Sequence, residues 1–218
     1  MSVPSSATAA RLRGLYAITP DEADSDVLIA KLRAALAGGA RVVQYRNKST
    51  DQALRRAQAG ALFALCREAG ASFIVNDDLE LALAIAADGL HLGRDDGDIA
   101  AARRALGPSR LLGASCYNRL ELAQRALQQG ADHVAFGSVF ASPTKPGAVR
   151  APLTLFAEAR RLGVPLIAIG GITLENAPQV ITAGADAIAV ISALFDAPRI
   201  EERAREFATL FNSQVSTS

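Results

Sequence analysis

One pattern recurs along the chain and limits its possible folds. An Ala- and Leu-rich segment ends at a glycine, and a short run of apolar, often β-branched residues follows. Such a sequence is typical of a helix, its C-terminal cap and a buried strand. The glycines that precede these runs are Gly39, Gly70, Gly107, Gly130, Gly163 and Gly184. Two further apolar runs, at 14–19 and 88–93, bring the number of predicted strands to eight.

The segments between the apolar runs are predicted to be helices. Their apolar side chains recur every three or four residues, as in Leu28, Leu32 and Leu36, so each helix can lay one stripe on a sheet. Asn118 and Glu121 have the spacing of a capping pair at the start of the helix after the fifth strand. Eight alternating units without a polar linker favour an α/β fold, a single (β/α)8 barrel. A doubly wound open sheet is the alternative.

The composition fits one domain without a macromolecular partner. Half of the 218 residues are hydrophobic, but only 5% are aromatic, and the net charge is +1. We predict a catalytic domain at 14–211 between flexible tails at 1–13 and 212–218, because both tails are small and polar. A net charge near zero excludes an overall positive electrostatic field that would attract nucleic acid. No apolar run is long enough to span a membrane. The predicted partners are therefore small-molecule substrates, and a homo-oligomer remains open.

The two cysteines indicate a reducing compartment. Cys66 and Cys116 are too few for a disulfide framework, and neither belongs to a CxxC or CxxH spacing. The first residues also lack the apolar stretch of a signal peptide. We therefore expect a cytoplasmic protein, in which Cys116 is a small residue at a strand end and not a nucleophile.

The polar residues of the sequence gather where a barrel places its chemistry, at the carboxyl ends of the strands. They follow the second, third, fourth and sixth predicted strands, and they are Gln44, Tyr45, Arg46, Asn47, Lys48, Asn76, Asp77, Asp78, Arg94, Asp95, Asp96, Ser142, Pro143, Thr144 and Lys145. His133 instead opens the sixth strand, so a structural role is predicted. His91 lies within the fourth strand, where a hydrogen-bonded interior histidine and a general base both remain open.

Two aspartates and three basic residues are candidates for a site that binds a diphosphate and a metal. Asp77 and Asp96 follow adjacent strands, and Mg²⁺ often takes one or two carboxylates together with water and phosphate oxygens. Aspartates in this position also serve as helix caps, so both interpretations stay open. Arg46, Lys48 and Lys145 can neutralise a diphosphate and stabilise it as it departs.

The last two predicted strands end in residues suited to a phosphate. Many barrels hold a phosphate after the seventh and eighth strands, on backbone N–H groups and a helix start. Here the candidate donors are the backbone N–H groups of Gly171, Ile191 and Ser192. This pattern predicts a second, monophosphate substrate separate from the diphosphate.

Taken together, seven motifs resemble the thiamine-phosphate synthase family, in order, spacing and strand position. They are QYRNK (44–48), ND (76–77), DGLHLGRDD (88–96), GAS (113–115), FGSVFASPTK (136–145), AIGGIT (168–173) and AVIS (189–192). The resemblance extends over almost the whole chain. Many relatives read PTxTK after the sixth strand and glutamate at the position of Asn47. Here Ser142 replaces a threonine, and Pro143 is expected to stiffen that loop.

The resemblance implies a role for each candidate residue. The segment 44–48 and Asn76 would bind an aminopyrimidine diphosphate, and Asp77 and Asp96 would bind Mg²⁺. Arg46, Ser115 and Lys145 would act in catalysis, with Ser115 and Lys145 at the pyrimidine or its diphosphate. Those expected at the thiazole phosphate are Ser142, Pro143, Thr144, Gly171, Ile191 and Ser192.

The reaction implied by the resemblance is a substitution at the exocyclic methylene of the pyrimidine. The nitrogen of a thiazole phosphate, or of its carboxylated form, displaces pyrophosphate and gives thiamine phosphate. We expect a largely dissociative step, because an electron-rich aminopyrimidine stabilises a methylene cation while Mg²⁺, Arg46 and Lys145 stabilise the leaving group.

Two other functions remain open. The first is a thiazole tautomerase of the same superfamily, whose members carry a histidine where this chain has Ser138. The second is a catalytically silent barrel that binds thiazole phosphate or thiamine phosphate. Loss of the metal carboxylates would mark such a barrel, but Asp77 and Asp96 are both present.

Overall fold

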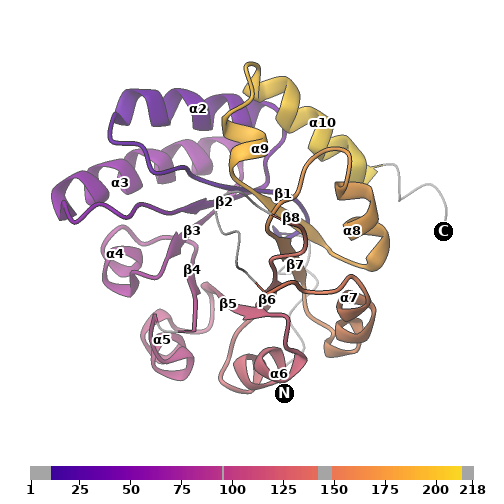
Figure 1. The fold of residues 1–218 in the computed structure, drawn as a ribbon. Helices are drawn as coiled ribbons and strands as arrows, with labels where there is room; N and C mark the ends of the chain where they lie inside the picture. Colours follow the sequence, from indigo (N-terminus) through magenta and orange to yellow (C-terminus); the bar gives the residue numbers. More distant parts are fainter. Residues whose placement is uncertain (1–10, 95, 142–148, 213–218) are drawn as a thin grey trace.

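The computed structural model describes residues 11–94, 96–141 and 149–212, and these form a closed barrel of parallel strands. Each strand pairs with the next along the chain, and the last pairs with the first, with Gly14 opposite Ala187. The strands surround a common axis and the helices lie outside them (Figure 1). This confirms the predicted (β/α)8 barrel and excludes the open sheet. The strands are β1 Gly14–Ile18, β2 Val42–Tyr45, β3 Ser72–Asn76, β4 Gly89–Leu92, β5 Leu111–Tyr117, β6 His133–Phe136, β7 Leu166–Ile169 and β8 Ala187–Val190.

The helices follow the strands in turn, so that every crossover lies on the outside of the barrel. Two helices, α9 and α10, follow the last strand, and α10 packs against α2 across the closure. Among the residues that the structure describes, none of the helices is long and apolar enough to cross a bilayer. The helices are α2 Ser25–Ala37, α3 Gln52–Ala69, α4 Leu79–Ala84, α5 Ile99–Leu106, α6 Leu120–Gln128, α7 Thr154–Ala159, α8 Ala177–Ala183, α9 Ser192–Phe195 and α10 Ile200–Asn212, with a 3-10 turn at Arg160–Leu162.

The helix ends show how local sequence sets these boundaries. Gly70 ends α3 at a φ of 67°, a left-handed conformation that costs glycine little. Four helices begin at an aspartate whose carboxylate accepts a backbone N–H of the first turn: Asp24, Asp51, Asp78 and Asp98. The predicted capping pair of α6 is wrong, because Arg119 is the N-cap and no side chain caps that helix.

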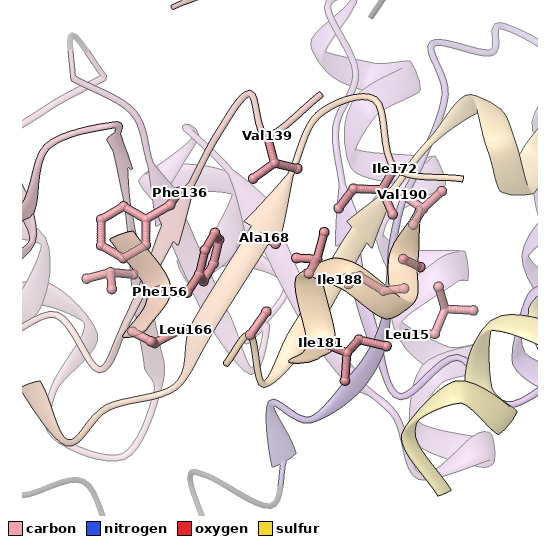
Figure 2. Close-up of a cluster of buried hydrophobic side chains, with 14 of the residues drawn as sticks. Leu15, Phe136, Val139, Phe156, Leu166, Ala168, Ile172, Ile181, Ile188 and Val190 are labelled. Carbon is pink, nitrogen blue, oxygen red and sulfur yellow. The ribbon is translucent and has the colours of Figure 1, made fainter. Parts of the chain in front are cut away.

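Alternation along the strands divides the apolar side chains between two layers. One set packs between the strands and the helices, as Figure 2 shows for Phe136, Phe156 and Ile188. The other set fills the interior of the barrel, and it includes Tyr16 and Ile74. Because the interior is filled, only side chains at the carboxyl ends of the strands open into the mouth.

The amino-terminal boundary differs from its prediction. Residues 11–13 fall in the predicted tail, but Leu12 is fully buried and packs with the interior set of side chains. Arg11 also pairs with Asp88 at 3.5 Å and donates to Ser72 Oγ at 3.3 Å. Leu12 therefore covers the amino end of the barrel, and the folded part includes residues 11–13.

Candidate active site

Gln44 is the deepest of the candidate residues at the mouth. It points into the barrel from β2 and is buried, and its Nε2 donates to the Tyr16 hydroxyl at 2.9 Å. Burial raises the pKa of Tyr16, so its hydroxyl stays protonated. The other amide atom, Oε1, has no hydrogen-bond partner among the described residues. The Gln44 side chain is thus held in place, and its Oε1 can accept a hydrogen bond from a ligand group such as an amino group.

The loop after β2 carries the basic residues and is organised by an aspartate that the sequence analysis missed. Asp21 accepts from Arg46 Nη1 at 3.1 Å and from the Lys48 backbone N–H at 2.8 Å. Thr19 adds two hydrogen bonds to the backbone of Arg46, at 2.9 and 3.0 Å. Asp21 and Thr19 follow β1, so the rule used for the other strands would have found them.

A pocket of about 570 Å³ opens beside this loop. Arg46, Lys48 and Arg55 line it, and they bring three cations to one cavity. The remaining lining residues are Asn47, Ser49, Thr50, Gln52, Asn76 and Asp77. This set suits a ligand with several negative charges.

Arg55 is a second residue that the sequence analysis missed. It lies in the first turn of α3, and its Nη2 pairs with Asp78 Oδ2 at 2.7 Å. Its Nε is buried without a partner among the described residues. Its position in the helix after β2, at the mouth end, is the signal that could have identified it.

Two candidate residues of the same segment have structural contacts that the sequence did not predict. Tyr45 points away from the mouth into the layer between strands and helices, where it stacks on Phe73 and donates to Gln58 Oε1 at 3.0 Å. Its side chain is therefore not a ligand of the mouth. Asn47 lines the pocket, but its Nδ2 donates to the same Gln58 oxygen at 2.9 Å. Alternation along β2 explains why Gln44 and Tyr45 separate.

Asp77 and Asp96 come together at the ends of β3 and β4. Burial first, and then the neighbouring carboxylate of Asp96, raise the pKa of Asp77 from 3.8 to about 6. Asn76 Nδ2 donates to Asp77 Oδ2 at 2.5 Å, and the Gly93 backbone N–H donates to Asp96 Oδ2 at 3.0 Å. Asp78, by contrast, caps α4. Two acids that converge in this way, with the charge of Asp77 disfavoured by its neighbour, fit a divalent cation.

The cation would lack a full protein cage. The described residues hold no group of three or more His, Cys, Asp or Glu side chains arranged for a metal. A pair of carboxylates is nevertheless what Mg²⁺ commonly takes, since it keeps water and substrate oxygens as its other ligands. Asp77 and Asp96 therefore fit a Mg²⁺ site that water and substrate complete, and they do not fit a structural site in which the protein supplies every ligand.

Ser115 lies at the end of β5 between the two sides of the mouth. Its Oγ is 2.9 Å from His91 Nε2. His91 is therefore a hydrogen-bonded interior histidine, which was one of the two roles that the sequence left open. Burial lowers the pKa of His91 to about 4.

The thiols of Cys66 and Cys116 are buried, and burial raises the pKa of both to about 12. Neither thiol is thus an activated nucleophile.

On the opposite side of the mouth, the candidate ligand groups are backbone N–H groups that follow β7 and β8. Gly171 has a φ of 65°, and a Cβ there would lie 2.4 Å from the Ala141 carbonyl oxygen, so the close approach of two loops requires glycine. The N–H groups of Gly171 and Ser192 donate to no acceptor among the described residues. Asn176 holds the Gly171 loop through the carbonyl oxygen, at 2.9 Å. Ile191 directly precedes α9.

The remaining candidates lie outside the described residues. These are Ser142, Pro143, Thr144 and Lys145, together with Asp95. Their assignments rest on the sequence alone.

Fold and site together define a (β/α)8-barrel enzyme with a cationic mouth. The pattern of the family described as thiamine monophosphate synthase matches residues 15–194. The chain belongs to this family, and it is an enzyme of the transferase class. The resemblance found in the sequence is thereby confirmed.

Individual relatives agree over nearly their full length. The thiamine-phosphate synthase of Methylobacillus flagellatus is 59% identical over 201 residues, which are 92% of this chain and 96% of the relative. That of Aromatoleum aromaticum is 60% identical over 204 residues, 93% of this chain and 98% of the relative. Among solved structures, thiamine phosphate pyrophosphorylase from Pyrococcus furiosus is 34% identical with a TM-score of 0.83, covering 94% and 98% of the two chains.

Proposed function

We propose that this chain joins an aminopyrimidine diphosphate to a thiazole phosphate, or to its carboxylated form, and releases thiamine phosphate and pyrophosphate, together with carbon dioxide when the thiazole is carboxylated. The carbon–oxygen bond of the exocyclic methylene breaks, pyrophosphate leaves with the electron pair, and the thiazole nitrogen forms the new bond. The observation that carries the proposal is the pocket of Arg46, Lys48 and Arg55 next to Asp77, in a chain of this family.

The diphosphate side has the groups that the leaving pyrophosphate requires. Arg46 and Lys48 bind its oxygens, and the Gln44 amide accepts from the pyrimidine amino group. Asn76 contributes an amide beside them, and Mg²⁺ on Asp77 and Asp96 would neutralise further negative charge. Lys145 is assigned to the leaving group from the sequence. Because these groups favour charge on the leaving oxygen, they support a dissociative step.

The backbone side is proposed to hold the thiazole phosphate. The N–H groups of Gly171 and Ser192, which have no acceptor in the part of the chain that the structure describes, are donors of the kind that bind phosphate in barrels. Ile191 precedes the same helix, and Ser142, Pro143 and Thr144 are assigned to this substrate from the sequence. Ser115 lies between the substrates and contacts the pyrimidine or its diphosphate. Two separate phosphate regions fit a two-substrate reaction.

The proposal is tested by incubating the purified protein with both substrates and Mg²⁺, and following thiamine phosphate and pyrophosphate. We expect one pyrophosphate for each thiamine phosphate, and loss of both products when a chelator removes the metal. Altered thiazole carboxylate without thiamine phosphate would support a tautomerase instead. Stabilisation by the ligands without turnover would support the silent barrel.

A further inference from the structure

Two histidines face each other in the barrel interior below the mouth. His91 on β4 and His133 on β6 have ring centroids 5.8 Å apart, and His133 is fully buried. Both rings are buried, and burial disfavours the charged form of an imidazole. Both rings are therefore neutral near pH 7, and each has one N–H donor and one acceptor nitrogen.

Most of these ring nitrogens are buried without a protein partner. His91 Nε2 contacts Ser115 Oγ at 2.9 Å, but His91 Nδ1 and both nitrogens of His133 have no partner among the described residues. A neutral histidine always keeps one N–H, and burying an unpaired donor is unfavourable. Because the described residues offer these nitrogens no partner, a buried water is the simplest group that can satisfy them.

Gly113 shows that the two rings approach the same point on β5. A Cβ on Gly113 would be 2.5 Å from His91 Nδ1 and 2.3 Å from His133 Nε2, so both nitrogens converge on the same side of β5. They form no direct hydrogen bond with each other. A buried water that bridges two polar atoms satisfies this arrangement.

We propose that His133 is a positioning residue, which acts through one buried water and His91 to orient the hydroxyl of Ser115. This inference rests on the proposed function, in which Ser115 contacts the pyrimidine diphosphate. Diphosphate oxygens and pyrimidine ring nitrogens are acceptors, so Ser115 has to donate its hydroxyl hydrogen to them.

The direction of every hydrogen bond in the chain then follows. Ser115 has one hydrogen, so its Oγ accepts from His91, and His91 carries its hydrogen on Nε2. His91 Nδ1 is then an acceptor and receives a hydrogen bond from the water. The water in turn accepts from His133 Nε2–H. His133 thus fixes the tautomer of a histidine that touches the proposed catalytic serine.

Nitrogen NMR tests the tautomers independently of activity. The chain has only two histidines, so untagged protein labelled with ¹⁵N in histidine gives two ring systems, and His133→Phe assigns them. We expect both rings with the hydrogen on Nε2 in the parent protein. In His133→Phe, His91 should become a mixture of tautomers. His91 with its hydrogen on Nδ1 in the parent protein would overturn the proposal.

Steady-state kinetics test whether the effect runs through Ser115. We expect His133→Phe to lower kcat about tenfold with little change in KM, the size of one lost hydrogen bond. In a Ser115→Ala background the same substitution should cost nothing further. An equal loss in both backgrounds would show that His133 acts only on stability. No loss from Ser115→Ala alone would overturn the link to catalysis.

Two further variants separate positioning from packing. Ile167→Ala removes volume from the same interior layer, so it should lower the melting temperature and leave kcat unchanged. His133→Gln keeps a donor close to the position of Nε2, and it should retain the His91 tautomer and most of kcat. If His133→Phe does not fold, the tautomer of His91 and the value of kcat can still be measured in His133→Gln. If the parent protein makes no thiamine phosphate, the proposed function fails, while the tautomers still test the hydrogen-bond chain.

Discussion

Asp77 combines several features of a functional residue. It has a φ of 64°, a left-handed conformation that few residues other than glycine adopt, although aspartate tolerates it. Its N–H is held by the His91 carbonyl oxygen at 2.9 Å, and its carboxylate lies beside that of Asp96. A backbone fixed in this way keeps two acids close together at a cost that a bound cation would offset.

Asp77→Asn tests the metal site with little disturbance of the backbone, because asparagine also tolerates a positive φ. The variant loses one charge of the pair. We expect the Mg²⁺ concentration for half-maximal turnover to rise by at least about tenfold. The measurement is the rate of thiamine phosphate formation over a Mg²⁺ titration.

Asp24→Asn is the matched control. Asp24 caps α2 on an exposed surface, and asparagine caps equally well. Its Mg²⁺ dependence should equal that of the parent protein. Equal rates for Asp77→Asn and the parent at limiting Mg²⁺ would remove Asp77 from the ligand set.

The raised pKa of Asp77 predicts how metal binding depends on pH. Between 3.8 and about 6 the folded metal-free protein holds a proton that the unfolded chain releases, so this group's contribution to stability is lost as pH rises through about 6. Mg²⁺ requires the deprotonated carboxylate, so its affinity should fall below pH 6, approaching about tenfold per pH unit.

Calorimetric titration with Mg²⁺ at a series of pH values checks this dependence. The same change should appear as a larger Mg²⁺-induced rise in melting temperature at about pH 7.5 than at about pH 5. Mg²⁺ affinity that is constant between these pH values would contradict a metal ligand whose pKa is raised in this way.

The location of residues at the mouth could be predicted from the sequence. The contacts that each residue makes there were harder to predict. Strand ends and alternation placed Gln44 and Asp77 correctly, because the period of a strand is fixed. Asp21 follows β1 and could have been predicted from its strand end, whereas the role of Arg55 depends on a contact between α3 and the start of α4. Tyr45 was misplaced as a ligand because it was taken with its motif, although alternation turns it outward.

At the scale of elements, three aspartates repeat one contact at the amino ends of alternate strands. Asp88, Asp132 and Asp186 precede β4, β6 and β8, and each accepts the backbone N–H of a residue on the preceding strand, at 2.8 to 2.9 Å. Asp132 also pairs with Arg103. These contacts lie at the end of the barrel opposite the mouth, where stability is decided.

Asp132→Ala should therefore lower stability without changing the chemistry. It leaves the Leu112 N–H and the Nη2 of Arg103 without the Asp132 carboxylate as acceptor, and we expect the free energy of unfolding to fall by about 2 kcal/mol. Urea denaturation measures this change. Glu158→Ala, at an exposed position of α7, should cost less than about 0.5 kcal/mol. A loss of kcat in folded Asp132→Ala would contradict the purely structural role.

Element boundaries show which local signals are dependable. The six glycines that precede the predicted strands all have a positive φ, so the pattern of helix, glycine and strand predicted real chain reversals. The capping pair at Asn118 failed, because a bulge near Tyr117 shifts the end of β5 and the helix begins after Arg119. A bulge depends on pairing between strands and has no local sequence signature here.

At the scale of the whole molecule, the barrel brings together loops that are far apart in sequence. Closure places β8 next to β1, so the Ser192 region and the loop after β1 belong to one mouth. The repeated units predicted this closure. They did not predict that Leu12 covers the opposite end, because a single leucine in a polar segment has no periodicity to identify it.

In the proposed reaction, one mouth holds a metal-bound diphosphate on one side and a monophosphate on the other. A crystal structure with Mg²⁺, pyrophosphate and thiamine phosphate would show both groups and the metal together. We predict Mg²⁺ on Asp77 and Asp96, pyrophosphate against Arg46 and Lys48, and the phosphate of the product on the backbone N–H groups of Gly171 and Ser192. Both phosphate groups on the same side, or a metal away from the two aspartates, would contradict this arrangement of the mouth.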